Sequence, residues 1–112
     1  MSNIDIMKVS KDIESKIVLL EKGREGLEPL ARTKATSIGN YDKALQIAVL
    51  KLKDEGKLPA TLIVQVAKGF CHKERADMEL ADALYKIQIV KMDAVQAELN
   101  GYQSIYRHLD ER

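Results

Sequence analysis

The chain has 112 residues, of which 46% are hydrophobic but only 4% aromatic, with no Trp, one Phe and one Cys. This length is typical of one domain with an aliphatic core, as in helical seams, and the sequence excludes an intramolecular disulfide and an apolar run long enough to span a membrane. The formal net charge is +1, from 18 basic and 17 acidic residues, so no global field attracts nucleic acid or anionic lipid.

The N-terminal half of the chain is expected to form two helices. A capping motif at the start is followed by apolar residues at three- and four-residue steps, which is the spacing of one helix face. Gly23, Gly26 and Pro29 interrupt this pattern, and Pro disrupts a helix interior. The sequence therefore predicts helices over residues 5–22 and 27–55, with one kinked, continuous helix as the alternative.

The second of these helices has an apolar face of its own. Gly56 follows it and can adopt the left-handed conformation that caps a helix C-terminus. The inward-facing residues are expected to be Leu30, Ala31, Ala35, Ile38, Tyr41, Leu45, Ala48, Val49 and Leu52.

The C-terminal half is expected to form a short helix and a long one. Pro59 in a first turn and Gly69 as a stop favour a helix over residues 59–68. The last helix, residues 71–109, contains no Pro, and its apolar residues alternate three- and four-residue steps, as in a coiled coil. Its seam consists of Met78, Ala81, Tyr85, Gln88, Met92, Val95, Leu99, Tyr102, Tyr106 and Leu109.

The last helix is too apolar to be buried by a single partner helix. The first two helices can cover one side of it as an antiparallel hairpin, but a helix that is apolar around most of its girth is buried on several sides. We therefore expect an all-α, coiled-coil-like antiparallel hairpin, a single domain over residues 1–112, completed by self-association, most simply as a dimer. The candidate self-association residues are Leu80, Leu84, Ile87, Ile89 and Val90.

Cys71 and His72 invite a metal or thiol interpretation. A structural zinc needs four protein ligands, whereas the only other histidine, His108, lies 36 residues away. A Gly-rich phosphate loop, a nucleophile elbow and a His-Glu-x-x-His motif are all missing from the sequence. We therefore expect no enzyme activity, no metal and no cofactor, and interpret Cys71 as a buried thiol beside a solvated His72.

One candidate contact surface for a partner lies near the C-terminal end of the last helix. Tyr102, Gln103, Tyr106 and Arg107 combine two aromatic rings with an amide and a guanidinium. Tyr and Arg are enriched at protein interfaces, which favours this group as a recognition surface. The alternative is that both tyrosines pack inward and only Gln103 and Arg107 remain at the surface.

A second candidate surface is the basic region of residues 51–73. From Gly56 to Lys73 the chain contains lysines but no acidic residue, and Lys68 and Lys73 are secondary candidates for contacting a phosphate backbone. Phe70 is the only aromatic residue nearby, so the region lacks the stacking platform of single-strand binders. Unpaired lysines on a solvated surface are the alternative interpretation.

Four motifs in the C-terminal half carry a family resemblance: LPATLI (58–63), AKG (67–69), LADALYK (80–86) and LNGYQSIYRHL (99–109). They cover residues 58–109 and resemble a family of small phage and prophage proteins of Gram-positive bacteria. Members of this family look like accessory genes near phage recombination functions and have no settled activity. The chain before Leu58 diverges from the family. The resemblance implies a longer connector at the point where this chain has only residues 54–57, so a role of that connector is not carried over to this chain.

Together, the residues and the resemblance favour an interaction protein over an enzyme. We expect a non-enzymatic helical protein that acts as an oligomer in the cytoplasm and docks on another protein, as a phage-type accessory or host-factor-modulating binder. The alternative is a nucleic-acid-binding accessory protein of phage recombination or replication that uses residues 51–73. No membrane partner is expected.

Overall fold

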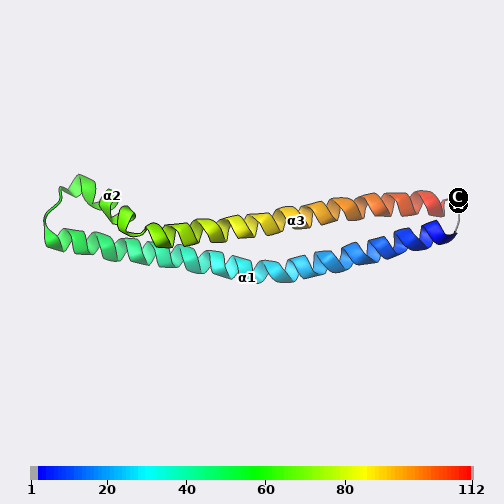
Figure 1. The fold of residues 1–112 in the computed structure, drawn as a ribbon, viewed down its shortest axis with the longest axis horizontal. Helices are drawn as coiled ribbons and strands as arrows, with labels where there is room; N and C mark the ends of the chain where they lie inside the picture. The colour runs from blue at the N-terminus through cyan, green and yellow to red at the C-terminus, as the bar shows by residue number, and fades with distance from the viewer. Residues whose placement is uncertain (1–2, 112) are drawn as a thin grey trace. The chain divides into compact units, whose positions relative to one another are not determined.

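The computed structural model describes residues 3–111, which are almost entirely helical (Figure 1). Helix α1 spans Asn3–Glu55, α2 spans Ala60–Phe70 and α3 spans His72–Asp110. No strand occurs in the described range, so the prediction of an all-α helical hairpin is confirmed. None of these helices combines enough length with enough apolar character to cross a membrane.

Helix α1 is one continuous helix where two were expected. It passes through Gly23, Gly26 and Pro29 without interruption. The predicted separation into residues 5–22 and 27–55 is therefore wrong, and the continuous alternative is the one that forms.

The reason for this continuity is the repeat on the buried side of α1. Leu20 and Gly23 are buried, and Leu27 and Leu30 are half-buried, so the three- and four-residue steps run straight through the Gly/Pro segment. Most helix stability in proteins comes from packing of one face, and this offsets the roughly 3 kcal/mol that an interior Pro costs relative to Ala.

The chain divides into two compact units. The central unit is Leu30–Tyr85 and contains the end of α1, all of α2 and the start of α3. The terminal unit combines the chain up to Pro29 with the chain from Lys86 onward. Within each unit the chain runs one way along α1 and returns along α3, which makes an antiparallel helix pair (Figure 1).

The core of the central unit forms where α2 packs on the end of α1. Leu52 of α1 and Ile63 and Ala67 of α2 are buried together. Gly56 directs the chain out of α1 with a positive φ of 65°, so the predicted left-handed cap is confirmed. Partly buried residues packed around this cluster are Leu45, Ala48, Val49, Leu58 and Val66.

Three residues assigned from the sequence to the inward face of α1 are exposed. Ala31, Ala35 and Ile38 face solvent, whereas Lys34 is half-buried and Ser37 is only 7% exposed. The Ser37 hydroxyl donates a hydrogen bond to the Lys34 carbonyl at 2.8 Å, which satisfies the buried polar atom without a partner from another helix. The buried side of α1 therefore keeps its three- and four-residue spacing here, but polar residues occupy two of its positions.

The short helix was expected over residues 59–68, but it begins one residue later and ends two residues later. Gly69 lies inside α2, which ends at Phe70. The backbone N–H of Cys71 then donates to the carbonyl of Lys68 at 3.1 Å and closes the last turn. This tight junction places Cys71 between α2 and α3.

In the terminal unit, the two helices come closest where α1 has no side chain. A Cβ atom added to Gly23 would lie 2.9 Å from Cγ of Met92. The side-chain amide of Gln88 donates a hydrogen bond to the Gly23 carbonyl at 3.2 Å. Gly23 therefore provides the space into which α3 packs. The sequence had suggested that this glycine ends a helix, whereas its role is to allow this close contact.

Candidate functional site

The seam predicted for the last helix is the packed side of α3. Every one of its residues is buried or half-buried, and Ala81, Leu99 and Leu109 are the fully buried ones. The three- and four-residue spacing alone identified this side correctly. Tyr102 and Tyr106 belong to it and are half-buried.

The five candidate self-association residues do not form a single surface. Leu80, Leu84 and Ile87 are 59%, 43% and 50% exposed, and their spacing places them on one flank of α3. Val90 is exposed on the outer side of the helix, and the half-buried Ile89 falls on the opposite flank. We call Leu80, Leu84 and Ile87 the apolar stripe.

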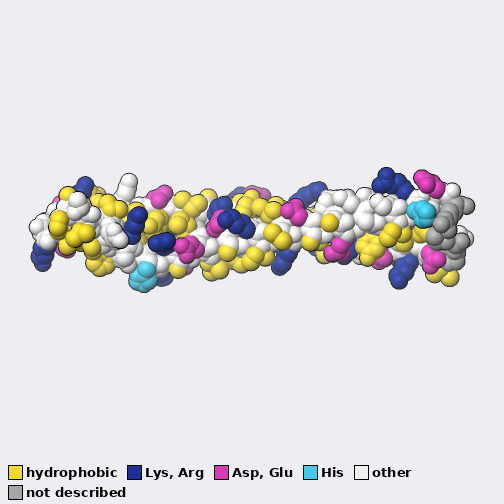
Figure 2. Space-filling model, turned by 90° about the horizontal axis from the view of Figure 1, so that it is seen from above, with side chains coloured by type: hydrophobic (Ala, Val, Ile, Leu, Met, Phe, Trp, Pro, Cys, Tyr) yellow, Lys and Arg dark blue, Asp and Glu magenta, His cyan; other side chains and the backbone are white. Residues whose placement is uncertain are grey.

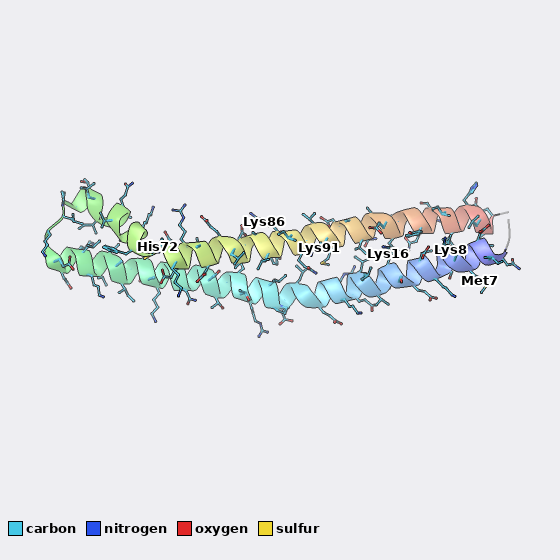
Figure 3. All side chains as sticks on the ribbon, viewed as in Figure 1. Met7, Lys8, Lys16, His72, Lys86 and Lys91 are labelled. Carbon is cyan, nitrogen blue, oxygen red and sulfur yellow. The ribbon has the colours of Figure 1, made fainter. Side chains whose placement is uncertain are left out.

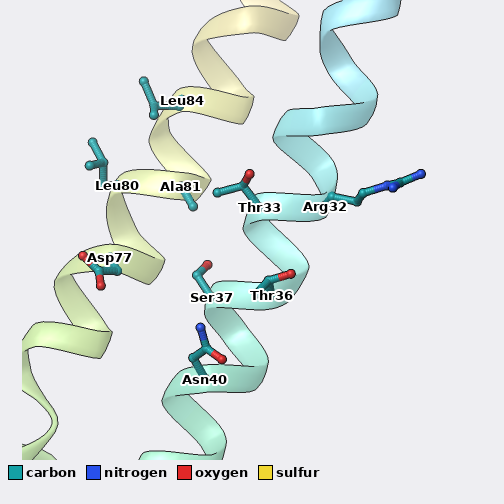
Figure 4. A pocket seen from close by; sticks show the side chains of 9 residues that line it. All are labelled: Arg32, Thr33, Thr36, Ser37, Asn40, Asp77, Leu80, Ala81 and Leu84. Atoms are coloured by element: carbon teal, nitrogen blue, oxygen red, sulfur yellow. The ribbon is translucent and has the colours of Figure 1, made fainter.

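Part of the apolar stripe borders an open groove of about 450 Å³ in the central unit (Figure 4). Leu80 and Leu84 point away from α1, while Ala81 points toward it. The floor of the groove is made of small residues, because Ser37 of α1 lies opposite Ala81 of α3. The lining consists of Arg32, Thr33, Thr36, Ser37, Asn40, Asp77, Leu80, Ala81 and Leu84.

Further apolar surface surrounds α2. Leu62, Val64 and Phe70 are exposed there, and hydrophobic side chains reach the surface at the end of the molecule that α2 occupies (Figure 2). The cluster under α2 therefore buries only one side of this short helix.

Three of the four C-terminal contact candidates meet at one groove in the terminal unit. Gln103, Tyr106 and Arg107 line it from α3, and Ser10 and Ile13 line it from α1. The groove has a volume of about 570 Å³ and is open to solvent. Gln103 and Arg107 are exposed, whereas Tyr102 and Tyr106 are half-buried on the packed side of α3, which is the arrangement expected under the alternative interpretation.

Two lysines of the basic region line different grooves. Lys51 lines a groove of about 350 Å³ whose wall also carries two carboxylates. Lys68 lines a different groove, of about 670 Å³, together with His72 and Arg75, whose guanidinium pairs with a glutamate at 3.2 Å. Lys73 lines neither of these grooves.

Cys71 and His72 have the environments that the sequence predicted. Cys71 is 2% exposed, and burial raises the pKa of its thiol, with Glu74 adding to the effect. A protonated thiol is a poor nucleophile. His72 is exposed at the start of α3 (Figure 3), where its Nδ1–H donates to the Gly69 carbonyl at 3.2 Å. Between residues 3 and 111, no three His, Cys, Asp or Glu side chains gather closely enough to hold a metal ion.

Sequence reasoning missed two lysines that connect α1 to α3. The ammonium of Lys16 lies 2.5 Å from the Glu98 carboxylate in the terminal unit. In the central unit, Lys34 lies 3.1 Å from Asp82 and 5.1 Å from the centre of the Tyr85 ring. Both lysines occupy steps of the buried repeat of α1, so spacing without regard to polarity would have found them.

Comparisons of the chain with family models, curated proteins and solved structures give no match. The candidate surfaces are therefore ranked by their own geometry. Two of them are considered further: the apolar stripe on α3, whose leucines are 59% and 43% exposed, and the groove lined by Gln103 and Arg107.

Proposed function

We propose that the chain is a non-enzymatic helical interaction protein that self-associates, most simply as a dimer, and docks on another protein in the cytoplasm. The observation that carries the proposal is the exposure of Leu80 and Leu84 in line on one side of α3. Apolar side chains gathered on a regular element mark interaction surfaces more often than scattered ones do.

Incomplete burial of the hydrophobic residues supports a second chain as the cover. Hydrophobic residues make up 46% of the sequence. Among residues 3–111, however, no large side chain is completely buried. Covering the exposed leucines with another helical hairpin removes apolar area from water, at about 25 cal/mol per Å².

Light scattering at micromolar concentration tests the self-association. The wild-type chain is expected to have twice the monomer mass. Leu84→Glu is expected to return the protein to a monomer, because it places a charge in an apolar interface. Val90→Glu is the matched control, since Val90 is exposed on the outer side of the same helix, and it should leave the dimer intact. A monomeric wild type would contradict the proposal.

The partner-binding surface proposed here is the C-terminal groove. The family resemblance supports a phage-type accessory role, in which the chain acts on a host factor or a recombination component. Gln103 and Arg107 line the groove and are exposed, and the half-buried Tyr106 lines it with them, while Tyr102 is half-buried on the seam. Exposed polar side chains above half-buried aromatic rings match the polar rim and aromatic core of protein interfaces.

Capture from host lysate, with and without nuclease, tests this surface. Replacing Gln103 and Arg107 together with Ala should preserve helix content and mass while abolishing capture, since exposed helix positions tolerate Ala. Asp93→Ala, at another exposed position of α3, is the control and should capture normally. Capture by the double variant at wild-type affinity would show that this groove is only a solvated surface.

Nucleic-acid binding is the second candidate, and the groove that contains Lys68, His72 and Arg75 favours it. Binding to a phosphate backbone weakens steeply with salt through counterion release, whereas an apolar helix interface changes little. DNA or RNA retained by the wild type, lost on Lys68→Ala and lost at high salt would support this candidate over protein docking.

A further inference from the structure

We infer that two copies pair through α3 in antiparallel orientation, around a two-fold axis that passes beside Leu84. The inference rests on the proposed self-association and specifies its geometry. It uses α3 alone, which is one continuous helix from His72 to Asp110.

The charges beside the apolar stripe are arranged symmetrically about Leu84. Asp77 lies seven residues before Leu84 and Lys91 lies seven residues after it. Because seven residues are close to two helical turns, all three share one line on the helix surface, with Leu80 and Ile87 directly beside it. All five side chains are exposed, and Lys91 is labelled in Figure 3.

A two-fold axis at Leu84 makes this line complementary to itself. Asp77 then lies opposite the partner's Lys91, and Lys91 lies opposite the partner's Asp77. Leu80 packs beside the partner's Ile87, so the apolar residues meet in the middle. A parallel arrangement would instead place each charge opposite its own copy, which is repulsive. Isologous interfaces of this kind require a surface patch that is self-complementary.

The groove next to the stripe provides room for a second copy. Thr33, Ser37 and Ala81 are small, and they leave the volume of about 450 Å³ that Leu80 and Leu84 border. A leucine from the partner's α3 can insert there as a knob into a hole. A second copy also supplies the Lys91 that pairs with Asp77.

Charge reversal tests the pairing. Asp77→Lys and Lys91→Asp should each raise the dimer dissociation constant about tenfold, because each turns two attractive cross-chain pairs into repulsive ones. The double variant Asp77→Lys/Lys91→Asp should return to within about twofold of the wild type, because both pairs are restored with their signs exchanged. In a parallel dimer the single reversals would change nothing.

Cross-linking locates the axis. A residue on a two-fold axis meets its own copy, so Leu84→Cys should be joined to itself efficiently by a short bis-maleimide reagent. The wild type, whose single thiol at Cys71 is buried, and Val90→Cys on the outer side of α3 should give little cross-linked dimer.

The outcomes separate the two proposals. A wild-type monomer would overturn self-association itself. A wild-type dimer that resists both charge reversals, or that fails to cross-link at Leu84→Cys, would overturn the two-fold pairing and leave self-association standing. Single reversals that weaken the dimer without rescue by the double variant would also overturn the pairing.

Discussion

The two units of this protein bury their side chains in different ways. In the central unit, α2 adds a third helix, and Leu52, Ile63 and Ala67 pack into a cluster. In the terminal unit only α1 and α3 meet, and the buried residues Leu20, Leu99 and Leu109 are spaced along a single seam. A pair of helices shields one line of side chains, and a third helix is needed to enclose a group of them.

This difference also explains why polar groups enter the seam. Lys16 in the terminal unit and Lys34 in the central unit both reach carboxylates on α3. Each keeps its charged end near water while its aliphatic stem covers part of the seam. A two-helix seam is narrow enough for this arrangement, because a long side chain can cross its edge.

The largest expected effect is the loss of stability when a buried leucine is shortened, either in the cluster or in the seam. Leu52→Ala should lower the free energy of unfolding by about 3 kcal/mol and Leu20→Ala by about 2 kcal/mol, because more side chains lose contacts in the cluster. Urea denaturation followed by circular dichroism measures both. Leu50→Ala, 61% exposed on the same helix, is the control and should cost less than about 0.5 kcal/mol. Equal losses at positions 52 and 50 would contradict the assignment of the cluster.

The next effect concerns Pro29, where the terminal unit ends on α1. Pro29→Ala should raise the free energy of unfolding by about 2 kcal/mol, because the continuous helix regains a backbone hydrogen bond. The gain is reduced because the unfolded chain becomes more flexible without the proline. Glu25→Ala, at an exposed position one turn earlier, should change little. A near-zero effect of Pro29→Ala would show that α1 is interrupted there after all.

A smaller effect distinguishes two glycines of α1, one in each unit. An added Cβ at Gly39, in the central unit, would meet nothing within 4 Å, so Gly39→Ala should stabilise the protein by about 1 kcal/mol. At Gly23, in the terminal unit, the new methyl group would press on Met92, so Gly23→Ala should lose that gain, and Gly23→Val should destabilise. Thermal unfolding of the three variants is the measurement. Equal stabilisation at both sites would exclude the close approach at Gly23.

The smallest expected effect is the pH dependence of the ion pair in the terminal unit. The hydrogen bond that Lys16 donates to Glu98 raises the pKa of Lys16 above its ordinary value of 10.5. Stability from a raised lysine pKa is fully present below the pKa of the unfolded chain and is lost as the pH rises through the pKa of the folded chain. The difference in urea midpoint between wild type and Lys16→Gln should therefore shrink as the pH rises above 10.5.

Glu98→Gln is the control for this titration. It removes the same pair from the other side, so its difference from wild type should follow the same pH dependence as that of Lys16→Gln. A difference that stays constant through the alkaline range would show that Lys16 contributes by packing alone.

The sequence predicted more about α3 than about the surfaces that α3 presents. Its seam follows strict three- and four-residue steps, so the packed side could be identified residue by residue, including Tyr102 and Tyr106. The candidate self-association group was less well defined, because a wide apolar girth does not say which flank is covered. The half-buried Ile89 belongs to a different flank from Leu80 and Leu84, which only the exposure of each side chain reveals.

The sequence by itself determined the helical class, the cap at Gly56 and the seam of α3, because these depend on local spacing and on the conformation of single residues. Only the tertiary structure decided that α1 continues through Pro29 and that Gly23, Lys34 and Ser37 lie on its buried side. Those choices depend on what α3 offers opposite each position. Met92 fills the space at Gly23, and Asp82 forms an ion pair with Lys34. Residues that look like interruptions along one helix are therefore accommodated by complementary side chains on the other.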